Sequence, residues 1–327
     1  MKPVLITGAT GFLGKHLVER LRAEGQPLRV LLRGASPWSS DIEVTPGDIN
    51  SREAVRRAMQ GAGQVYHLAG AVSRDPKDDA LMYQVHVEGT RNVCEAALEH
   101  RPDKLVIVSS SGSIAVSKEP VIHNEESGYK HEVVGQWAYY MSKIFAEKLA
   151  LSYVRLHNLP VVIVNPALLL GPGDDRNSST NDVAMLLDGQ ILALPLGGMS
   201  FVDARDAAAG LAGAMHAGRI GERYMLGGVN WTFRRIIQEV GRIAKVGVPR
   251  MQPSLSMSLW SARLLRNVFR LKGLDDVTVR MSALFWYCDS SKAAAELGFH
   301  SRDPLETLAD TVADIRRRRA SSRASQS

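Results

Sequence analysis

Short aliphatic runs alternate with longer amphipathic segments along the first half of the chain. The runs predict buried strands, and apolar residues that recur every three or four positions predict helices. The predicted strands are Pro3–Thr7, Leu28–Arg33, Ile42–Thr45, Gln64–Leu68, Lys104–Ser109 and Val161–Asn165, and the predicted helices are Phe12–Ala23, Arg52–Met59, Leu81–His100 and Trp137–Leu156. This alternation is typical of βαβ units, so we expect an α/β fold with a Rossmann-type, doubly wound parallel sheet.

Beyond Gly171 the pattern is looser. It predicts helices at Ala204–Ala217 and Thr232–Lys245, a strand at Arg223–Leu226 and an irregular segment from Val246 to Cys288. We therefore expect two lobes rather than two independent domains. Residues 1–170 form the dinucleotide-binding lobe, to which a late strand and helix return, and residues 171–315 form a smaller C-terminal substrate-binding lobe.

Composition and charge argue against nucleic-acid-binding, metal-binding and membrane-spanning classes of protein. The net charge of +6 over 327 residues comes largely from Arg316–Arg319 and Arg323, without which 35 basic residues face 34 acidic ones. Residues 316–327 therefore predict a basic, disordered tail, and we expect no nucleic-acid partner. Cys94 and Cys288 match no disulfide framework or metal spacing. With no signal peptide or membrane span visible, we expect a cytoplasmic protein without a metal.

Three glycines follow the first predicted strand and open the first predicted helix. Gly8, Gly11 and Gly14 stand where the chain must turn tightly, approach a pyrophosphate and pack the helix on the sheet. The helix N-terminus would supply N–H donors to the phosphates. The sequence therefore predicts a dinucleotide site, and its contact residues are Gly8, Thr10, Gly11, Phe12, Leu13 and Gly14.

The end of the second strand indicates the form of the cofactor. An acidic residue there would bind the ribose 2′-hydroxyl, but this chain has Arg33, whose guanidinium suits a 2′-phosphate. We therefore expect NADP to be preferred over NAD, which stays possible. Asp48 and Ile49 follow Gly47 after the third strand and are candidate adenine contacts, although an aspartate in an exposed turn explains Asp48 equally well.

Candidate catalytic residues lie on one helix and one strand end. Tyr139 and Lys143 are four residues apart, so they share a helix face, where the ammonium would stabilise a tyrosine phenolate. Tyr139 then becomes an acid or base for proton transfer. The Ser109–Ser111 run ends the fifth strand at the carboxyl edge of the sheet. We select Ser111 as the hydroxyl that bonds the substrate oxygen, with Ser113 as its alternate.

These motifs together resemble the extended short-chain dehydrogenase/reductase family. The resemblance covers nearly the whole chain. Within the family, the chain is most similar to the dihydroflavonol reductase, hopanoid-associated epimerase-like and 3β-hydroxysteroid dehydrogenase branch. Its further motifs are Gly47-Asp48, His67 to Gly70, Gly89 to Asn92, Asn165-Pro166, Phe201 to Asp206, and Asp289 to Ala293.

The resemblance implies hydride transfer between nicotinamide C4 and a carbonyl carbon, with Tyr139 as the proton donor in reduction. It also implies that Lys143 holds the nicotinamide ribose. The cofactor would be lined by Leu68, Ala69 and Gly70, and the nicotinamide would lie beside Pro166 and Ala167. A homodimer formed through the helices at Leu81–His100 and Trp137–Leu156 is implied as well.

One position departs from the family pattern. Many relatives carry asparagine where this chain has His86, shortly before Gly89. If that asparagine braces the active-site backbone or a relay water, His86 can take its place, which leaves the proton relay open. A hydrogen-bonded structural histidine is the interpretation that we favour.

The second lobe indicates the substrate class. Its apolar and aromatic groups are Ser256 to Trp260, Leu264-Leu265, Val268-Phe269 and Phe285 to Tyr287, most of which core packing explains. The excess favours an apolar small-molecule substrate such as an aromatic polyketide, flavonoid, terpenoid or steroid-like ketone. Cationic residues alternate with this set and indicate, more weakly, contact with a membrane surface; they are Arg263, Arg266, Arg270 and Lys272.

Two rival functions stay open. A nucleotide-sugar epimerase or dehydratase uses the same tyrosine and lysine with a tightly held NAD. Arg234, Arg235 and Arg250 favour it mildly because such a site binds a second pyrophosphate, whereas Arg33 opposes it. A non-catalytic, NADP-binding redox sensor is the alternative from another class of protein. The substrate itself and the physiological direction are not determined by the sequence.

Overall fold

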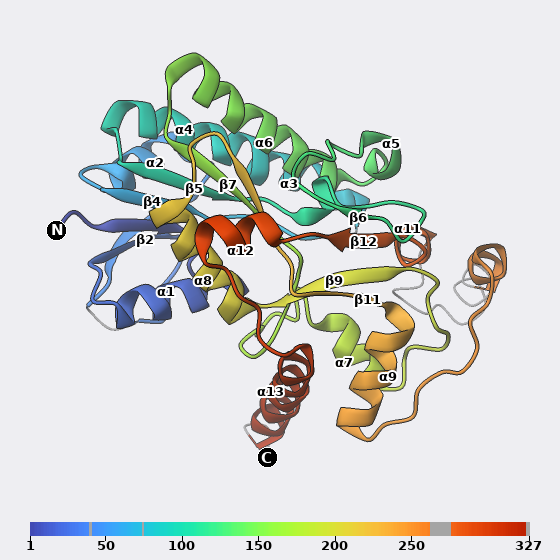
Figure 1. Ribbon diagram of the computed structural model, residues 1–327. Coiled ribbons are helices and arrows are strands. Elements are labelled where there is room, and N and C mark those ends of the chain that lie inside the picture. Colours follow the sequence, from blue (N-terminus) through green and yellow to red (C-terminus); the bar gives the residue numbers. More distant parts are fainter. Residues whose placement is uncertain (39–40, 74, 262–275, 325–327) are drawn as a thin grey trace.

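A seven-stranded parallel sheet forms the centre of the first lobe (Figure 1). The computed structural model describes residues 1–38, 41–73, 75–261 and 276–324. The strand order is β3-β2-β1-β4-β5-β7-β10. The strands are β1 (Val4–Thr7), β2 (Leu28–Leu32), β3 (Glu43–Pro46), β4 (Gln64–His67), β5 (Lys104–Val108), β7 (Val161–Pro166) and β10 (Arg223–Leu226). The predicted doubly wound fold is confirmed, and the late strand returns to the sheet as expected.

The strand order reverses between β1 and β4, which leaves a crevice at their carboxyl ends. Side chains alternate across the sheet, so that Val4 and Ile6 join one core while Leu5 joins the other. Helices α1 (Phe12–Ala23) and α8 (Ala204–Ala217) cover one face; α2 (Arg52–Met59), α4 (Gly89–His100) and α6 (Ala138–His157) cover the other. Both faces are therefore buried, and ligands reach the sheet at its carboxyl edge.

The helix predicted over Leu81–His100 is broken by a wide turn. The structure has α3 (Asp79–Tyr83), a π-helical turn over Gln84–Glu88 and then α4. A π-turn carries one extra residue per turn, a local change that apolar periodicity does not register. His86 lies at the middle of this turn.

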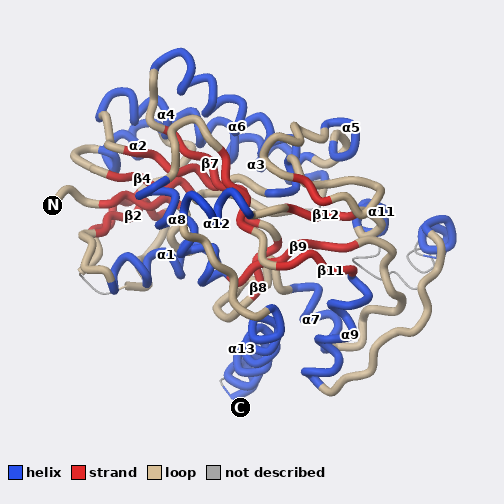
Figure 2. The backbone as a smooth tube through the Cα atoms, in the orientation of Figure 1, coloured by secondary structure: helices blue, strands red, loops and turns tan. Residues whose placement is uncertain are grey.

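The second lobe is built on a smaller sheet with the order β11-β9-β12-β6, and β8 pairs with β9 (Figure 2). Its strands are β6 (Ile122–His123), β8 (Leu168–Leu170), β9 (Gly198–Asp203), β11 (Val229–Thr232) and β12 (Phe285–Cys288). Further helices within the described residues are α5 (His131–Val134), α7 (Asn181–Leu187), α9 (Phe233–Ala244), α11 (Asp276–Met281), α12 (Ser291–Leu297) and α13 (Pro304–Ala324), of which α5 and α12 pack on helices of the first lobe. The segment predicted as irregular thus contains α11 and β12, because pairing with β9 orders β12.

The predicted disordered tail is instead part of a helix. Helix α13 continues to Ala324. Arg317 and Arg318 form ion pairs with Asp314 on the preceding turn, and Arg319 pairs with Asp188 beyond α7. These ion pairs hold the basic run against the rest of the protein as part of α13. Composition alone does not reveal such partners.

The proposed membrane-contact segment is only partly described. The cationic residues from Arg263 to Lys272, and the apolar pairs at 264–265 and 268–269, lie outside the described residues. Within the described part of the chain, no helix is long and apolar enough to cross a membrane.

Candidate active site

The glycine turn after β1 is tightly packed. Gly8 has a φ of 74°, and a Cβ there would stand 2.6 Å from the backbone nitrogen of Ala69. A Cβ on Gly14 would stand 2.2 Å from the carbonyl oxygen of Gly8. Only glycine fits at both positions. The turn therefore closes against the segment that follows β4.

The N-terminus of α1 has the features of a phosphate site. Its N-cap residue is Gly11, no side chain caps it, and no acidic residue lies in the first turn. Phe12 and Leu13 are buried and hold the helix on the sheet, while Thr10 and Gly11 are partly exposed. Uncapped N–H groups at a helix N-terminus attract anions. These residues fit the pyrophosphate of a dinucleotide.

Hydrogen bonds between side chains join β1 to β4 below this turn. Thr7 Oγ1 lies 2.8 Å from Nδ1 of His67, whose Nε2 lies 3.1 Å from Oγ1 of Thr90. Thr7 Oγ1 also accepts a hydrogen bond of 3.3 Å from the N–H of Ala69. Burial lowers the pKa of His67 to about 3, so this histidine is neutral. The switch point is thus held rigidly by groups beneath the cofactor site.

The adenosine end presents the predicted cationic residue to solvent. Arg33 follows β2, its side chain is 75% exposed, and its Nε lies 3.7 Å from Oδ2 of Asp48. Asp48 Oδ1 accepts a hydrogen bond from the N–H of Asn50, as a turn aspartate does. Ile49 is buried in the core below. An exposed ion pair of this length is weak, so Arg33 is available to a phosphate.

The residues predicted to line the nicotinamide lie at the same edge of the sheet. Leu68 and Ala69 are partly exposed just beyond β4, and Gly70 is exposed. Pro166 ends β7, and Ala167 donates a hydrogen bond of 3.0 Å to the carbonyl of Leu226. The predicted lining residues therefore share one edge, and their contact with a cofactor stays a prediction.

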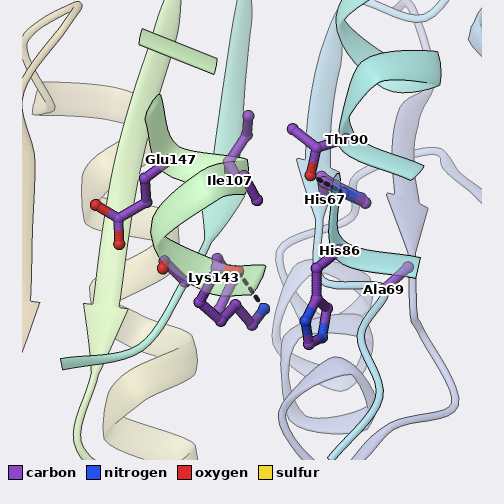
Figure 3. Close-up of a pocket in the computed structure, with 10 residues that line it drawn as sticks. His67, Ala69, His86, Thr90, Ile107, Lys143 and Glu147 are labelled. Carbon is purple, nitrogen blue, oxygen red and sulfur yellow. Dashed lines mark hydrogen bonds between the residues drawn. The ribbon is translucent and has the colours of Figure 1, made fainter. Parts of the chain in front are cut away.

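Tyr139 and Lys143 lie one turn apart on α6, as predicted. Lys143 Nζ donates a hydrogen bond of 3.1 Å to the carbonyl oxygen of Val108 at the end of β5 (Figure 3). Burial lowers the pKa of Lys143 to about 8. Burial also raises the pKa of Tyr139, and a hydrogen bond with the Ser110 side chain lowers it in part. Burial therefore has the largest effect on the pKa of Tyr139, whereas we expected the charge of Lys143 to have it.

The serine run divides between two environments. The serine side chain that lowers the pKa of Tyr139 belongs to Ser110. Ser111, the predicted hydroxyl, begins the short 3-10 turn after β5 and is 6% exposed. Ser113, the alternate, donates to the carboxylate of Glu147 and to the Ser110 carbonyl. The role of Ser111 stays a prediction, and Ser110 becomes a second candidate.

Sequence reasoning missed a buried carboxylate next to this site. Glu147 is completely buried one turn beyond Lys143. It accepts hydrogen bonds from Ser113 and Asn165 and from Tyr129, and it pairs with Arg223 at 3.2 Å. Its spacing of four residues from Lys143 was the available signal, because it places both side chains on one helix face.

His86 is hydrogen-bonded at both ring nitrogens. Nε2 lies 3.1 Å from the N–H of Ala71, and Nδ1 lies 2.8 Å from Oγ of Ser142. The prediction of a satisfied structural histidine is confirmed.

Two of the three arginines that favoured a second pyrophosphate site contact other side chains of the second lobe. Arg234 bonds the side chain of Gln252, and Arg235 stacks on Trp231 with its guanidinium carbon 3.9 Å from the ring centroid. Arg250 is exposed beyond α9. Their geometry adds nothing to the epimerase alternative.

Known proteins are similar in sequence to this chain. The model of the NAD dependent epimerase/dehydratase family matches residues 4–227. A Synechocystis protein named "Putative dihydroflavonol 4-reductase" is 31% identical over 94% of this chain and 92% of its own length. "Sterol demethylase protein B" of Methylococcus capsulatus is 30% identical over 96% of this chain and 98% of its own.

Solved structures agree with this relationship. The crystal structure of gox2253 has a TM-score of 0.84 at 30% identity and covers 97% of this chain and 98% of that one. The NAD complex of Thermus thermophilus UDP-glucose 4-epimerase, at 23% identity, has a TM-score of 0.75 over 96% of this chain and 99% of its own, and shares the fold. A dinucleotide cradle, a tyrosine–lysine pair and a family match over more than half of the chain lead to one conclusion. This chain belongs to the NAD-dependent epimerase/dehydratase family and is an NAD(P)-dependent enzyme of the extended short-chain dehydrogenase/reductase type.

Proposed function

We propose that this enzyme is an NADP-preferring reductase or dehydrogenase that acts on the ketone or secondary alcohol of an apolar substrate. The observation that carries the proposal is the position of Tyr139 and Lys143. They lie one turn apart on α6, and Lys143 donates a hydrogen bond to the carbonyl at the end of β5. This edge of the sheet also carries the glycine turn, so hydride and proton donors can meet there.

The protonation states suit carbonyl reduction. When bound, the nicotinamide supplies a hydride to the carbonyl carbon. Burial raises the pKa of Tyr139, so the free enzyme holds it as a neutral phenol that can donate its proton to the new alkoxide. Lys143 is largely protonated at neutral pH, since burial lowers its pKa only to about 8. Its charge stabilises the phenolate that Tyr139 becomes.

Arg33 supports the phosphorylated cofactor. Its side chain is 75% exposed beside the end of β2, where the adenosine ribose of a dinucleotide lies in this fold. A guanidinium can bond a 2′-phosphate in a bidentate manner, and it offers no acceptor to a free 2′-hydroxyl.

Apolar side chains around the tyrosine support an apolar substrate. Tyr140 stacks on Trp286 with ring centroids 4.8 Å apart, and Met141, Met199 and Met281 pack partly exposed against this aromatic group. Methionine adapts to irregular apolar ligands. Relatives named for dihydroflavonol, cinnamoyl-CoA and sterol chemistry agree with a flavonoid, aromatic polyketide, terpenoid or steroid-like ketone.

The test incubates the purified protein with NADPH and a panel of apolar ketones and nucleotide sugars. We expect net NADPH oxidation with a ketone, and Tyr139→Phe should lower kcat at least about 100-fold with unchanged NADPH affinity. Tyr153→Phe, on the same helix but outside this aromatic group, is the matched control and should keep the wild-type kcat. Epimer formation without net oxidation would favour the epimerase, and cofactor binding without turnover would favour the redox sensor.

A further inference from the structure

The hydrogen bonds of His86 define its tautomer. The backbone N–H of Ala71 donates to Nε2, so the ring proton lies on Nδ1. Nδ1 then donates to Ser142 Oγ, which donates to the carbonyl oxygen of Tyr139 at 2.9 Å. One neutral side chain therefore connects the segment after β4 to the first turn of α6.

The ring also contacts Tyr139. His86 is 2% exposed, and its ring meets that of Tyr139 edge to face with centroids 5.7 Å apart. A Cβ added to Gly70 would stand 3.3 Å from His86 Nε2 and 3.6 Å from Lys143 Nζ, so both side chains face Gly70. Figure 3 shows the Lys143 amine directed toward the side of the pocket on which His86 lies.

His86 is uncharged, which suits its place near the cation Lys143. Burial, followed by the charge of Lys143, lowers its pKa to about 2, and neutral His67 is the other titratable neighbour. A second cation beside Lys143 is thereby avoided. The π-helical turn over Gln84–Glu88 is a local distortion of the kind that often occurs at functional sites, and it carries this residue.

We propose that His86 is a positioning residue, which sets the distance between the nicotinamide and Tyr139 by joining Ala71 to Ser142. The segment before Ala71 is the predicted cofactor lining, and Ser142 orients the backbone that carries the tyrosine. The proposal rests on the proposed function for its kinetic test, while its structural part stands on the hydrogen bonds alone.

The kinetic test compares two variants. His86→Phe keeps a ring against Tyr139 but removes both hydrogen bonds, and we expect kcat to fall about 10- to 100-fold with less than about a 3-fold change in the KM for NADPH. His86→Gln can accept from Ala71 and donate to Ser142, so it should recover most of the lost rate. The primary isotope effect of 4-deuterated NADPH on kcat should rise in His86→Phe, because hydride transfer becomes slower.

The controls separate positioning from folding. His123→Phe removes another buried histidine, on β6, and should leave kcat unchanged. Thermal unfolding of each variant reports the structural effect by itself. A His86→Phe enzyme with wild-type kcat, or a His86→Gln enzyme as slow as His86→Phe, would overturn the proposal.

A second measurement needs no turnover. Long-range ¹⁵N NMR of the NADP-bound enzyme should show His86 neutral with its proton on Nδ1 from pH 5 to pH 9. A titration near pH 6.5, or a proton on Nε2, contradicts the positioning role. An enzyme inactive on every ketone, with the expected tautomer, would refute the proposed function and leave the His86 linkage standing.

Discussion

Asn165 Nδ2 donates a hydrogen bond of 2.7 Å to Oε1 of Glu147, and the same amide reaches the carbonyl of Ser110 at 3.1 Å. A residue at the end of β7 thus ties the serine loop to the catalytic helix. Glu147 also pairs with Arg223, whose side chain is 18% exposed. The carboxylate is the centre of this network.

Replacing Glu147 should destabilise the fold. Glu147→Gln removes the charge, keeps the volume and leaves Arg223 without its partner, so the free energy of unfolding should fall by about 3 kcal/mol. Urea unfolding measures the change. Glu132→Gln, at an exposed position on α5, is the control and should change stability by less than about 0.5 kcal/mol. Equal stabilities of the two variants would show that the network contributes little.

The two candidate serines can be separated by alanine substitutions. Because the Ser110 side chain lowers the pKa of Tyr139, Ser110→Ala should lower kcat about 10- to 100-fold. If Ser111 bonds the substrate oxygen, as the sequence predicts, Ser111→Ala should show a comparable or larger loss. Steady-state kinetics with the best ketone substrate decide between them. Full activity in either variant removes that serine from the mechanism.

Arg33 should decide the cofactor form. Arg33→Asp places an acceptor beside the ribose and repels a 2′-phosphate, so the ratio of kcat/KM for NADPH to that for NADH should fall about 100-fold or more. Arg22→Asp, on the exposed C-terminal turn of α1, is a control for a general loss of positive charge. An unchanged ratio in Arg33→Asp would refute the role of Arg33.

The burial of Lys143 should cost stability. Its pKa is about 8 in the folded protein and has its ordinary value of 10.5 in the unfolded chain, so below pH 8 both states are protonated and the folded state carries the full penalty. Between about pH 8 and pH 10.5 the unfolded chain binds the extra proton, so stability rises with pH. Lys143→Met should therefore be more stable at pH 7, by roughly 1–3 kcal/mol, and inactive.

Unfolding in urea at pH 7 and at pH 10 measures this difference, which should shrink at the higher pH. Lys148→Met, at an exposed site on the same helix, should show no comparable gain. A Lys143→Met protein less stable than wild type at pH 7 would contradict the prediction.

An exposed apolar face supports a homodimer. Leu81, Tyr83 and Phe145 are 46%, 47% and 42% exposed, and the rings of Tyr83 and Phe145 lie edge to face across α3 and α6. We propose that a second copy covers this face. Phe145→Glu should convert a dimer into a species of the single-chain mass, 35.7 kDa, in light scattering. Val121→Glu, at another exposed apolar position, should leave the mass unchanged; a wild-type monomer would refute the proposal.

By itself the sequence determined the alternation of strands and helices, the glycine turn and the shared helix face of Tyr139 and Lys143. These features depend on short-range periodicity and on residues whose backbone freedom or spacing is visible locally. The return of the Arg223–Leu226 strand to the first sheet was also predicted, and its pairing with β7 confirms it.

Only the tertiary structure decided which distant groups meet. His86 joins Ala71 to α6, and Glu147 accepts hydrogen bonds or pairs with residues of β7 and β10. The arginines of α13 likewise find carboxylates that order what composition presents as a tail. Such contacts depend on packing between elements far apart in the chain, where sub-ångström geometry selects one hydroxyl or carboxylate among several candidates.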